Sequence, residues 1–297
     1  MVELHPVARQ CADSAILISG SARSGTTIVG KLVHSFECVE YVFEPPALIA
    51  LFSLIEDLPL AQWNFLYEAY LYEEFLINAV SGRTINTNRI DDSSIYAVKS
   101  DKEIEGRLNR SWPKIDSTAA AAQSRAAYKI PNIVPFIPNL RSRYPGMNVV
   151  MMVRGAIETI HSLLAKHVFT PGHPSAAMPW PFRLFDNERL PYWIRKGDEK
   201  LWQELNEIDR CAYYYIRMNE GLQTSERQIV LKYADLVKSP QAVASQLADF
   251  LGLSFGACTD TIIRSIKPTG KALDSTVIAS ISDLFRDEVT EYSARAE

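Results

Sequence analysis

The sequence predicts a single α/β domain over residues 1–297, in which helices cover both faces of a central parallel sheet. Two observations support this fold class. Short apolar runs of strand length alternate with longer segments of helical periodicity, which is the pattern of a parallel sheet. A glycine-bounded loop also joins the first strand to the first helix, as in domains that bind phosphates beyond the ends of their strands. Apolar residues make up 47% of the chain, which is enough for a large core.

The expected strands are short apolar runs, most of them rich in valine and isoleucine. They are Ala15–Ile18, Val39–Phe43, Ile95–Val98, Val149–Val153 and Ile229–Leu231. Helical periodicity occupies most of the intervals between them. The expected helices are Thr26–Phe36, Ala61–Val80, Val134–Arg143, Ala156–His167, Lys200–Leu222 and Ala242–Leu251. Residues 169–192 are rich in proline and aromatic residues, and we expect an inserted loop there, either a lid over an acceptor or a passive surface excursion.

The loop from Gly20 to Gly25 has the Gly-x-x-x-x-Gly frame of a nucleotide-binding P-loop, so the predicted sheet is of the P-loop type. Its backbone N–H groups and the helix N-terminus are suited to binding a phosphate. Kinases continue this frame with a lysine, but Thr26 stands at that position and the cation comes earlier, at Arg23. Thr27 can still contact a metal or a phosphate, but we find no acidic strand end that completes a magnesium site. The loop therefore fits a donor with one 5′-phosphate better than a triphosphate; a glycine loop without a ligand is the alternative.

A second phosphate site is predicted at Arg154 and Ser162. Arg154 ends a buried strand, and Ser162 lies eight residues further on, about two turns into the next helix. An arginine fork and a helix hydroxyl together can bind a phosphate, although each residue is also ordinary at its position. Two phosphate sites indicate a nucleotide phosphorylated at two places. Glu44 follows another strand, so we expect it to share one crevice with Arg154 and the loop.

Bulk properties exclude several classes of protein. The net charge of −4 argues against general nucleic-acid binding. The four cysteines form no Cys-x-x-Cys pair, so neither a disulfide nor a zinc site is expected, and a reducing cytoplasm fits best. We find no secretory signal and no apolar run near the ~20 residues that cross a bilayer. We therefore expect no metal, no nucleic-acid partner, no transmembrane segment and a cytoplasmic location, while the oligomeric state, a homodimer included, stays open.

Four segments, in this order, resemble the sulfotransferase family, whose members use 3′-phosphoadenosine 5′-phosphosulfate (PAPS). They are Ser21–Thr27, Arg154 with Ser162, Val230–Pro240 and Leu247–Leu253. The resemblance implies that Arg23 to Thr27 bind the 5′-phosphosulfate and that Arg154 and Ser162 bind the 3′-phosphate. The nucleotide-binding loop residues are then Ser21, Ala22, Arg23, Ser24, Gly25, Thr26 and Thr27. Gly155-Ala156 departs from the Asp-Pro or Asn-Pro of many members, which changes the turn but leaves the arginine and the serine in place.

Within the family, the chain resembles the branch that contains tyrosylprotein and Golgi carbohydrate sulfotransferases. The segment Tyr41–Pro46 is similar to one that carries their general base, which implies this role for Glu44. A carboxylate after a strand, beside a cradle of N–H groups, is also well placed to take a hydroxyl proton; a helix-capping carboxylate is the alternative. The segment Tyr128–Pro131 resembles the branch's Lys-x-Pro, which implies that Lys129 neutralises charge on the sulfuryl group or the bridging oxygen. A lysine that extends from a strand towards water is the alternative.

Tyr233, Lys267 and Lys271 are expected near the nucleotide, although lysines before Pro or Gly often lie in solvated turns. His161 and His167 share the helix of Ser162, and we assign neither of them as the base.

The sequence therefore predicts transfer of a sulfuryl group from PAPS to the hydroxyl of a glycan, glycolipid or small metabolite, by in-line displacement. Glu44, Arg23 and Lys129 are the expected catalytic residues, and adenosine 3′,5′-bisphosphate is the second product. Three alternatives stay open: a small-molecule kinase that uses Mg²⁺-ATP, a sulfotransferase for peptide tyrosine, and a non-catalytic nucleotide-binding module. Aromatic residues at 180–193 are candidates for an acceptor cleft, whereas those at 63–72 are expected to form a buried helix face.

Overall fold

The centre of the molecule is a five-stranded sheet with the strand order β2-β3-β1-β4-β7. The computed structural model describes residues 4–91, 93–170, 181–267 and 276–296. All neighbouring strands of this sheet run parallel, so the predicted fold class is confirmed. In spatial order the strands are β2 (Val39–Phe43), β3 (Arg125–Lys129), β1 (Ile16–Gly20), β4 (Asn148–Val153) and β7 (Gln228–Lys232).

One of the expected strands is wrong, and a different segment takes its place. Ile95–Val98 does not join the sheet; it begins with the 3₁₀-helix η2 (Ile95–Ala97). The strand that the prediction missed is β3, which pairs with β1 on one side and β2 on the other. Alanine is a poor strand former, so the run Arg-Ala-Ala-Tyr-Lys gave little signal. Position overrides propensity here, because Ala126 and Ala127 are fully buried between the neighbouring layers.

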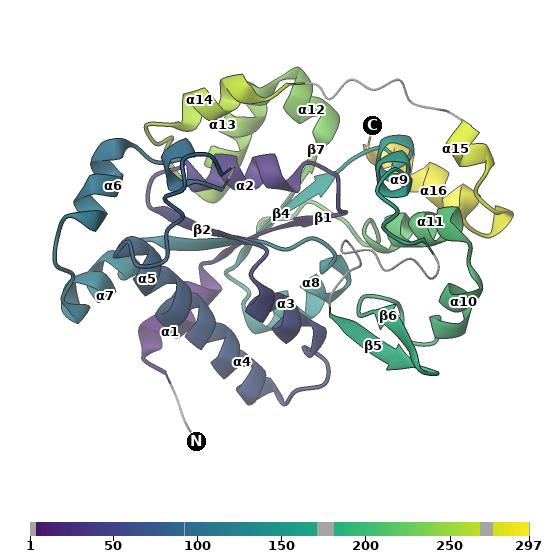
Figure 1. Cartoon of the computed structure of the whole chain (residues 1–297), viewed down its shortest axis with the longest axis horizontal. Helices are drawn as coiled ribbons and strands as arrows, with labels where there is room; N and C mark the ends of the chain where they lie inside the picture. Colours follow the sequence, from purple (N-terminus) through teal and green to yellow (C-terminus); the bar gives the residue numbers. More distant parts are fainter. Residues whose placement is uncertain (1–3, 92, 171–180, 268–275, 297) are drawn as a thin grey trace.

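Helices cover both faces of the sheet (Figure 1). The upper face in this view carries α2 (Thr26–His34), α12 (Tyr233–Lys238), α13 (Pro240–Leu251) and α14 (Thr259–Ser265). The lower face carries α1 (Pro6–Asp13), α3 (Pro46–Ser53), α4 (Leu60–Ala69), η1 (Tyr70–Leu76), α5 (Ile77–Val80), η3 (Val134–Phe136) and α8 (Ile137–Arg143). Alternating side chains of β1 enter the two cores: Ile16 and Ile18 pack on the α2 side, and Leu17 packs on the other.

Two further groups of helices flank the sheet at its ends (Figure 1). Beyond the edge strand β2 lie α6 (Asp101–Leu108) and α7 (Lys114–Ala122). On the opposite side lie α9 (Ala156–Leu164), α10 (Glu199–Glu204), α11 (Glu207–Arg217), α15 (Thr276–Ala279) and α16 (Asp283–Ala296). The helix predicted over Lys200–Leu222 is therefore two helices. The break has a clear cause, since the Asn206 side chain accepts a hydrogen bond from the Asp209 N–H and caps the start of α11.

The segment expected as a loop around residues 169–192 is partly a hairpin. Residues 171–180 lie outside the described part of the chain. The residues after them form the antiparallel pair β5 (Phe182–Phe185) and β6 (Glu188–Pro191). The two turn residues, Asp186 and Asn187, both have positive φ angles, of 46° and 63°. Such a two-residue turn matches the twist of a hairpin, so a loop is the wrong description of this part.

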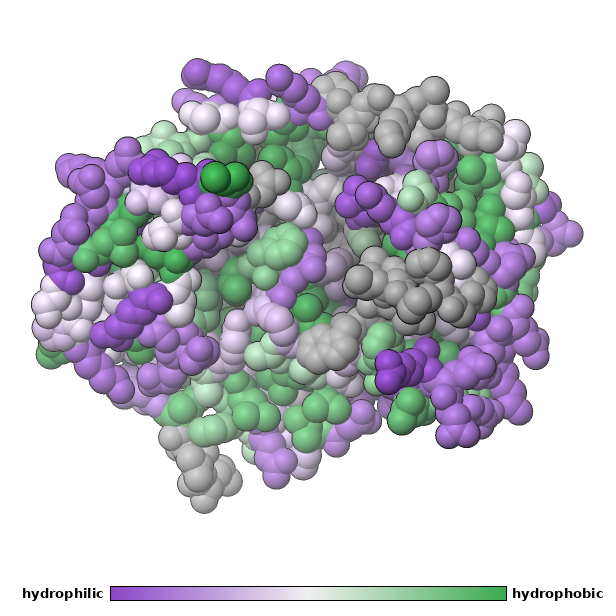
Figure 2. Space-filling view, in the orientation of Figure 1, coloured by the Kyte–Doolittle hydropathy of each residue, from purple (hydrophilic) through white to green (hydrophobic). Residues whose placement is uncertain are grey.

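The outer surface is mixed in character. Hydrophilic residues dominate the rim of the face shown in Figure 2, while hydrophobic residues appear mostly inside that rim. Among the described helices, none combines the length and the apolar character that crossing a bilayer requires.

Candidate functional site

The loop between β1 and α2 lies at the carboxyl ends of the parallel strands, and two glycines fix its course. A Cβ at Gly20 would lie 2.3 Å from the Met152 carbonyl oxygen, so β1 and β4 leave room there for glycine alone. Gly25 has a φ of +95°, and a Cβ there would lie 2.6 Å from Cδ2 of Tyr233. Both glycines thus let the backbone turn where a side chain has no space.

Inside the loop, the backbone is folded back on itself. The Ser24 hydroxyl donates a 2.7 Å hydrogen bond to the Ser21 carbonyl, and Arg23 adopts a positive φ of 73°. The Ser21 hydroxyl is buried and has no hydrogen-bond partner among the described residues. A buried polar atom without a partner is rare, and it commonly marks the place of a water, an ion or a ligand.

The predicted second phosphate site touches this loop directly. The Arg23 Nε donates to the Ser162 hydroxyl at 3.0 Å, and the Arg154 Nη1 donates to the Arg23 carbonyl oxygen at 3.0 Å. The Arg154 guanidinium lies over the Tyr233 ring, 4.3 Å from its centre, and Tyr215 donates to the Arg154 carbonyl. Because the Arg23 carbonyl and the Tyr233 ring hold the guanidinium and Tyr215 holds the backbone, the charge of Arg154 has a fixed position beside the loop.

Glu44 and Lys129 meet at the ends of two adjacent strands. Lys129 ends β3 in register with Phe43, the last residue of β2, and Glu44 follows directly. The Lys129 Nζ forms an ion pair with Glu44 Oε1 and lies 3.3 Å from the Thr27 hydroxyl. The Lys129 side chain is only 5% exposed. Burial lowers the pKa of Lys129 below the ordinary lysine value, and the Glu44 carboxylate opposes this shift only in part.

The structure excludes the interpretation of Glu44 as a helix-capping carboxylate. Its own backbone has a positive φ of 42°, stabilised by a 2.9 Å hydrogen bond from the Glu44 N–H to the Lys129 carbonyl. Helix α3 starts with Pro45 as its cap and has no side-chain cap bond within the described residues. Glu44 is therefore not a helix cap, and its carboxylate points to Lys129 instead. The interpretation of Lys129 as a lysine extended into water is likewise wrong.

These residues line one cavity of about 660 Å³, so the expected shared crevice is present. Five cationic and two acidic side chains contribute to its wall, which gives a local positive excess in a chain of net charge −4. They are Arg23, Lys31, Lys129, Arg154 and Lys166, and Glu44 and Glu158. Such a surface attracts anionic ligands. Of the other expected binding residues, Ala22, Gly25, Thr26, Thr27, Ser162 and Tyr233 also line it.

Three expected binding residues are not among those that line this wall, and a fourth cannot be placed. Ser21 and Ser24 lie in the loop and are both buried, and neither is among the residues that line the cavity. Lys267 is exposed beyond α14 and is not among the described residues that line the cavity. Lys271 lies outside the described residues.

No sequence pattern indicated Tyr214 and Asn132, which support the loop from behind. The Tyr214 hydroxyl accepts a 2.5 Å hydrogen bond from the Ala22 N–H and donates to Oδ1 of Asn132. Tyr214 is buried in the middle of a Tyr-Tyr-Tyr run, which looks like ordinary helix core. Only its position in space reveals its contact with the loop.

Within the described ranges, no three His, Cys, Asp or Glu side chains come together as a metal-binding group.

A family model described as the sulfotransferase family matches residues 15–257 of the chain. A search of curated proteins found no match.

Similar solved structures include three sulfotransferases. The sulfotransferase domain from the curacin biosynthetic pathway has 16% sequence identity and a TM-score of 0.47, with 95% of this chain and 96% of that chain covered. The sulfotransferase domain of the Synechococcus PCC 7002 olefin synthase has 14% identity and a TM-score of 0.46, with 95% and 93% covered. A sulfotransferase from Mycobacterium avium has 12% identity and a TM-score of 0.47, with 98% and 78% covered.

Proposed function

The chain belongs to the sulfotransferase family, and from this premise we propose that it transfers the sulfuryl group of PAPS to the hydroxyl group of an acceptor. The observation that carries this proposal is the arrangement of one cavity with two cationic anchor points and a carboxylate. The loop with Arg23 forms the first anchor, Arg154 with Ser162 forms the second, and Glu44 lies beside the loop. We also propose that residues 1–297 act as one sulfotransferase domain.

The residues present fit a nucleotide phosphorylated at its 5′ and 3′ positions. The buried hydroxyl of Ser21 and the buried Nε of Arg154 have no partner in the described structure, so both sites retain hydrogen-bonding capacity. The loop amides, Arg23 and the helix N-terminus at Thr26 would hold the 5′-phosphosulfate. Arg154 and Ser162 would hold the 3′-phosphate, with the Tyr233 ring fixing the plane of the guanidinium.

When bound, PAPS supplies a sulfuryl group that is activated by its bond to a phosphate. Glu44 takes the proton of the acceptor hydroxyl as the new O–S bond forms and the S–O bond to the 5′-phosphate breaks. The ion pair with Lys129 orients the Glu44 carboxylate towards the loop. Lys129 and Arg23 place positive charge where negative charge develops, and such preorganised donors are typically worth about 3 kcal/mol each. The acceptor is a glycan, a glycolipid or a small metabolite with a free hydroxyl.

The test is transfer of ³⁵S from labelled PAPS to a panel of hydroxyl acceptors, with calorimetric titration of adenosine 3′,5′-bisphosphate in parallel. We expect micromolar binding of the bisphosphate, weaker binding of AMP, and label transfer that depends on the acceptor. The same titration and turnover assay is carried out with Mg²⁺-ATP. Preferred binding and turnover of Mg²⁺-ATP would support a kinase and overturn the proposal. Tight bisphosphate binding without transfer to any acceptor would instead support a non-catalytic module.

A further inference from the structure

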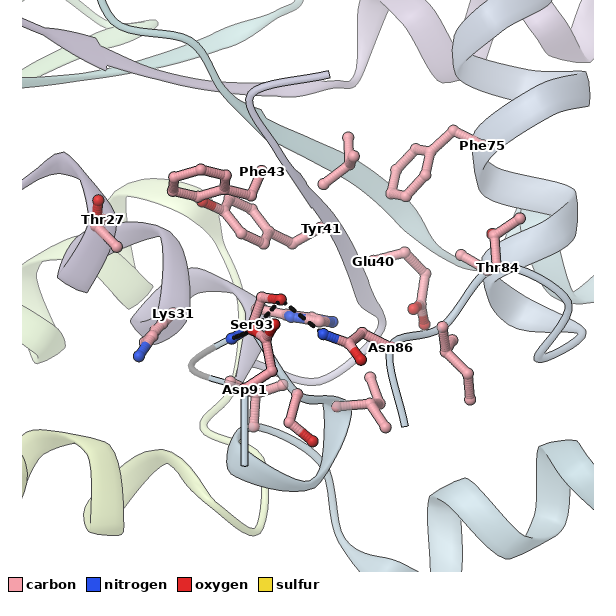
Figure 3. A pocket seen from close by; sticks show the side chains of 17 residues that line it. Thr27, Lys31, Glu40, Tyr41, Phe43, Phe75, Thr84, Asn86, Asp91 and Ser93 are labelled. Carbon is pink, nitrogen blue, oxygen red and sulfur yellow. Dashed lines mark hydrogen bonds between the residues drawn. The ribbon is translucent and has the colours of Figure 1, made fainter. Parts of the chain in front are cut away.

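A second cavity, of about 510 Å³, adjoins the proposed nucleotide site and plays no part in the mechanism so far (Figure 3). Thr27, Lys31 and Phe43 line both cavities. Glu44 follows Phe43 directly, so the proposed base stands where the two cavities meet. In Figure 3, Thr27 lies at one end of the second cavity, and Phe75, Thr84 and Glu40 lie towards the other. A molecule in this cavity can therefore reach the base with one end only.

Most of the exposed surface of the second cavity is apolar, although polar side chains line it as well. It is formed by α2, by the edge strand β2, by the helix formed by η1 and α5, and by residues within 84–91 and 93–98. Its apolar side chains are Val42, Phe43, Phe75, Ala79, Ile85, Ile95 and Val98. A cavity of this size and character is typical of sites for small molecules, whose apolar bodies it removes from water.

The charged groups of this wall neutralise one another. Glu40, at the inner end, is 3% exposed and forms two hydrogen bonds of 2.8 Å with the Arg107 guanidinium. Lys31 and Asp91 add one charge of each sign. Burial, and then the positive charges of Lys99 and Arg107, lower the pKa of His34, so its ring is neutral at pH 7. The wall thus offers a charged ligand no uncompensated partner.

Two of the lining residues carry hydroxyl groups that are themselves buried beneath the wall. The hydroxyls of Tyr41 and Ser94 are buried, and neither has a partner in the described part of the chain. Gly30 makes room for the first, because a Cβ there would lie 2.2 Å from the Tyr41 oxygen. Burial raises the pKa of Tyr41 far above its ordinary value, so this hydroxyl keeps its proton and can donate. Apolar walls with a few polar points are suited to an uncharged ligand with few polar groups.

Building on the proposed function, we propose that this cavity binds the acceptor, and that the acceptor is an uncharged phenol or alcohol with an extended apolar body. The body lies along the cavity, and its hydroxyl reaches Glu44 at the junction. A glycan would bury many hydroxyl groups and a peptide its amide groups, whereas several polar side chains of this wall already bond to protein: Asn86 to Ser93, and Glu40 to Arg107. Of the acceptors that the sequence left open, this cavity favours a small metabolite over a glycan.

The experiment measures transfer from labelled PAPS to a series of 4-alkylphenols, from phenol to 4-hexylphenol. Each methylene that enters the cavity is expected to raise kcat/KM about fourfold, mainly through KM, until the space is filled. Val42→Phe enlarges a half-buried side chain of the wall and should abolish the gain for the longer members. The affinity for adenosine 3′,5′-bisphosphate should stay unchanged in this variant. Thr84→Trp narrows the same cavity from an exposed position and repeats the test if the first variant is unstable.

Val168→Phe is the matched control. Val168 lines a smaller cavity of about 300 Å³, which shares Ala22 and Arg23 with the nucleotide cavity. If this variant removes the chain-length dependence while Val42→Phe and Thr84→Trp do not, the acceptor site is the smaller cavity and the inference is overturned. A second outcome is that the protein binds the bisphosphate and sulfates saccharides efficiently but shows no response to alkyl length. This outcome overturns the proposed acceptor class and leaves the proposed function intact. Absence of both bisphosphate binding and transfer overturns the proposed function itself.

Discussion

Lys129 and Glu44 form an ion pair between the ends of two adjacent parallel strands, and the same lysine nitrogen lies 3.3 Å from the Thr27 hydroxyl. This one contact joins three parts of the proposed site: the end of β3, the residue after β2 and the start of α2. Parallel strands bring their carboxyl ends to one edge, so the fold itself creates such a meeting point. The roles of these residues can be separated by substitution.

Replacing Glu44 with glutamine should reduce turnover by at least about 100-fold. The amide keeps the shape of the side chain and can still accept a hydrogen bond from Lys129, but it cannot take the acceptor proton. Affinity for adenosine 3′,5′-bisphosphate should stay within about twofold of wild type, because Glu44 contributes no positive charge to either phosphate site. Steady-state transfer assays and calorimetry measure the two quantities.

Glu56→Gln is a suitable control for this change, since Glu56 pairs with Lys196 on the surface. It should leave turnover unchanged. Near wild-type turnover of the Glu44 variant would exclude Glu44 as the base.

Replacing Lys129 with arginine should alter the alkaline side of the pH–rate profile. Burial lowers the pKa of Lys129 below 10.5, so in wild type the cation is lost, and kcat falls, at a pH below that value. Arginine keeps its charge throughout the accessible range, so the variant should be slower at neutral pH but lack this alkaline fall. The measurement is kcat as a function of pH, up to the limit set by protein stability. An unchanged alkaline fall in Lys129→Arg would show that another group titrates.

Local sequence patterns predicted the parts of the site that lie close together in the chain. The loop glycines, Arg154 with Ser162 and the carboxylate after β2 all have a recognisable spacing. By contrast, β3 was missed because its alanines carry a weak strand signal, and only burial between two layers makes them a strand. Tyr214 supports the loop from a distance of 192 residues, and no local pattern encodes such a contact. The second cavity is likewise not encoded locally, since its wall combines side chains of α2 and β2 with others between Phe75 and Val98.

Gly25→Ala should destabilise the protein and weaken nucleotide binding together. Alanine at a φ of +95° costs about 1–2 kcal/mol in backbone strain alone, and its Cβ would press against the Tyr233 ring at 2.6 Å. Displacing Tyr233 also removes the support of the Arg154 guanidinium. Thermal unfolding and bisphosphate titration measure both effects.

Gly106→Ala serves as the matched glycine substitution. Gly106 lies inside α6, where a Cβ would meet no described atom within 4 Å, so alanine should stabilise the fold by about 0.5–1 kcal/mol. Equal effects of the two substitutions would contradict the special role of Gly25.

Arg154→Ala should discriminate between nucleotides. If Arg154 binds the 3′-phosphate, its loss removes charge-assisted hydrogen bonds. The affinity for adenosine 3′,5′-bisphosphate should then fall by about 10- to 100-fold. AMP lacks that phosphate and should bind almost as it does to wild type. The measurement is the calorimetric Kd of each nucleotide. Arg295→Ala removes an exposed surface arginine and is the control for the loss of a charge.

The comparison with AMP matters because Arg154 has a second contact. Its Nη1 also donates to the Arg23 carbonyl, so the substitution can disturb the loop that binds the 5′-phosphate. A disturbed loop would lower the affinity for both nucleotides by the same factor, whereas a lost 3′-phosphate contact lowers the affinity for the bisphosphate alone. Ser162→Ala separates the two further, since Ser162 contacts the Arg23 side chain and not its backbone. Equal losses for both nucleotides in Arg154→Ala, with no selective loss in Ser162→Ala, would show that this arginine supports the loop and that the second phosphate site lies elsewhere.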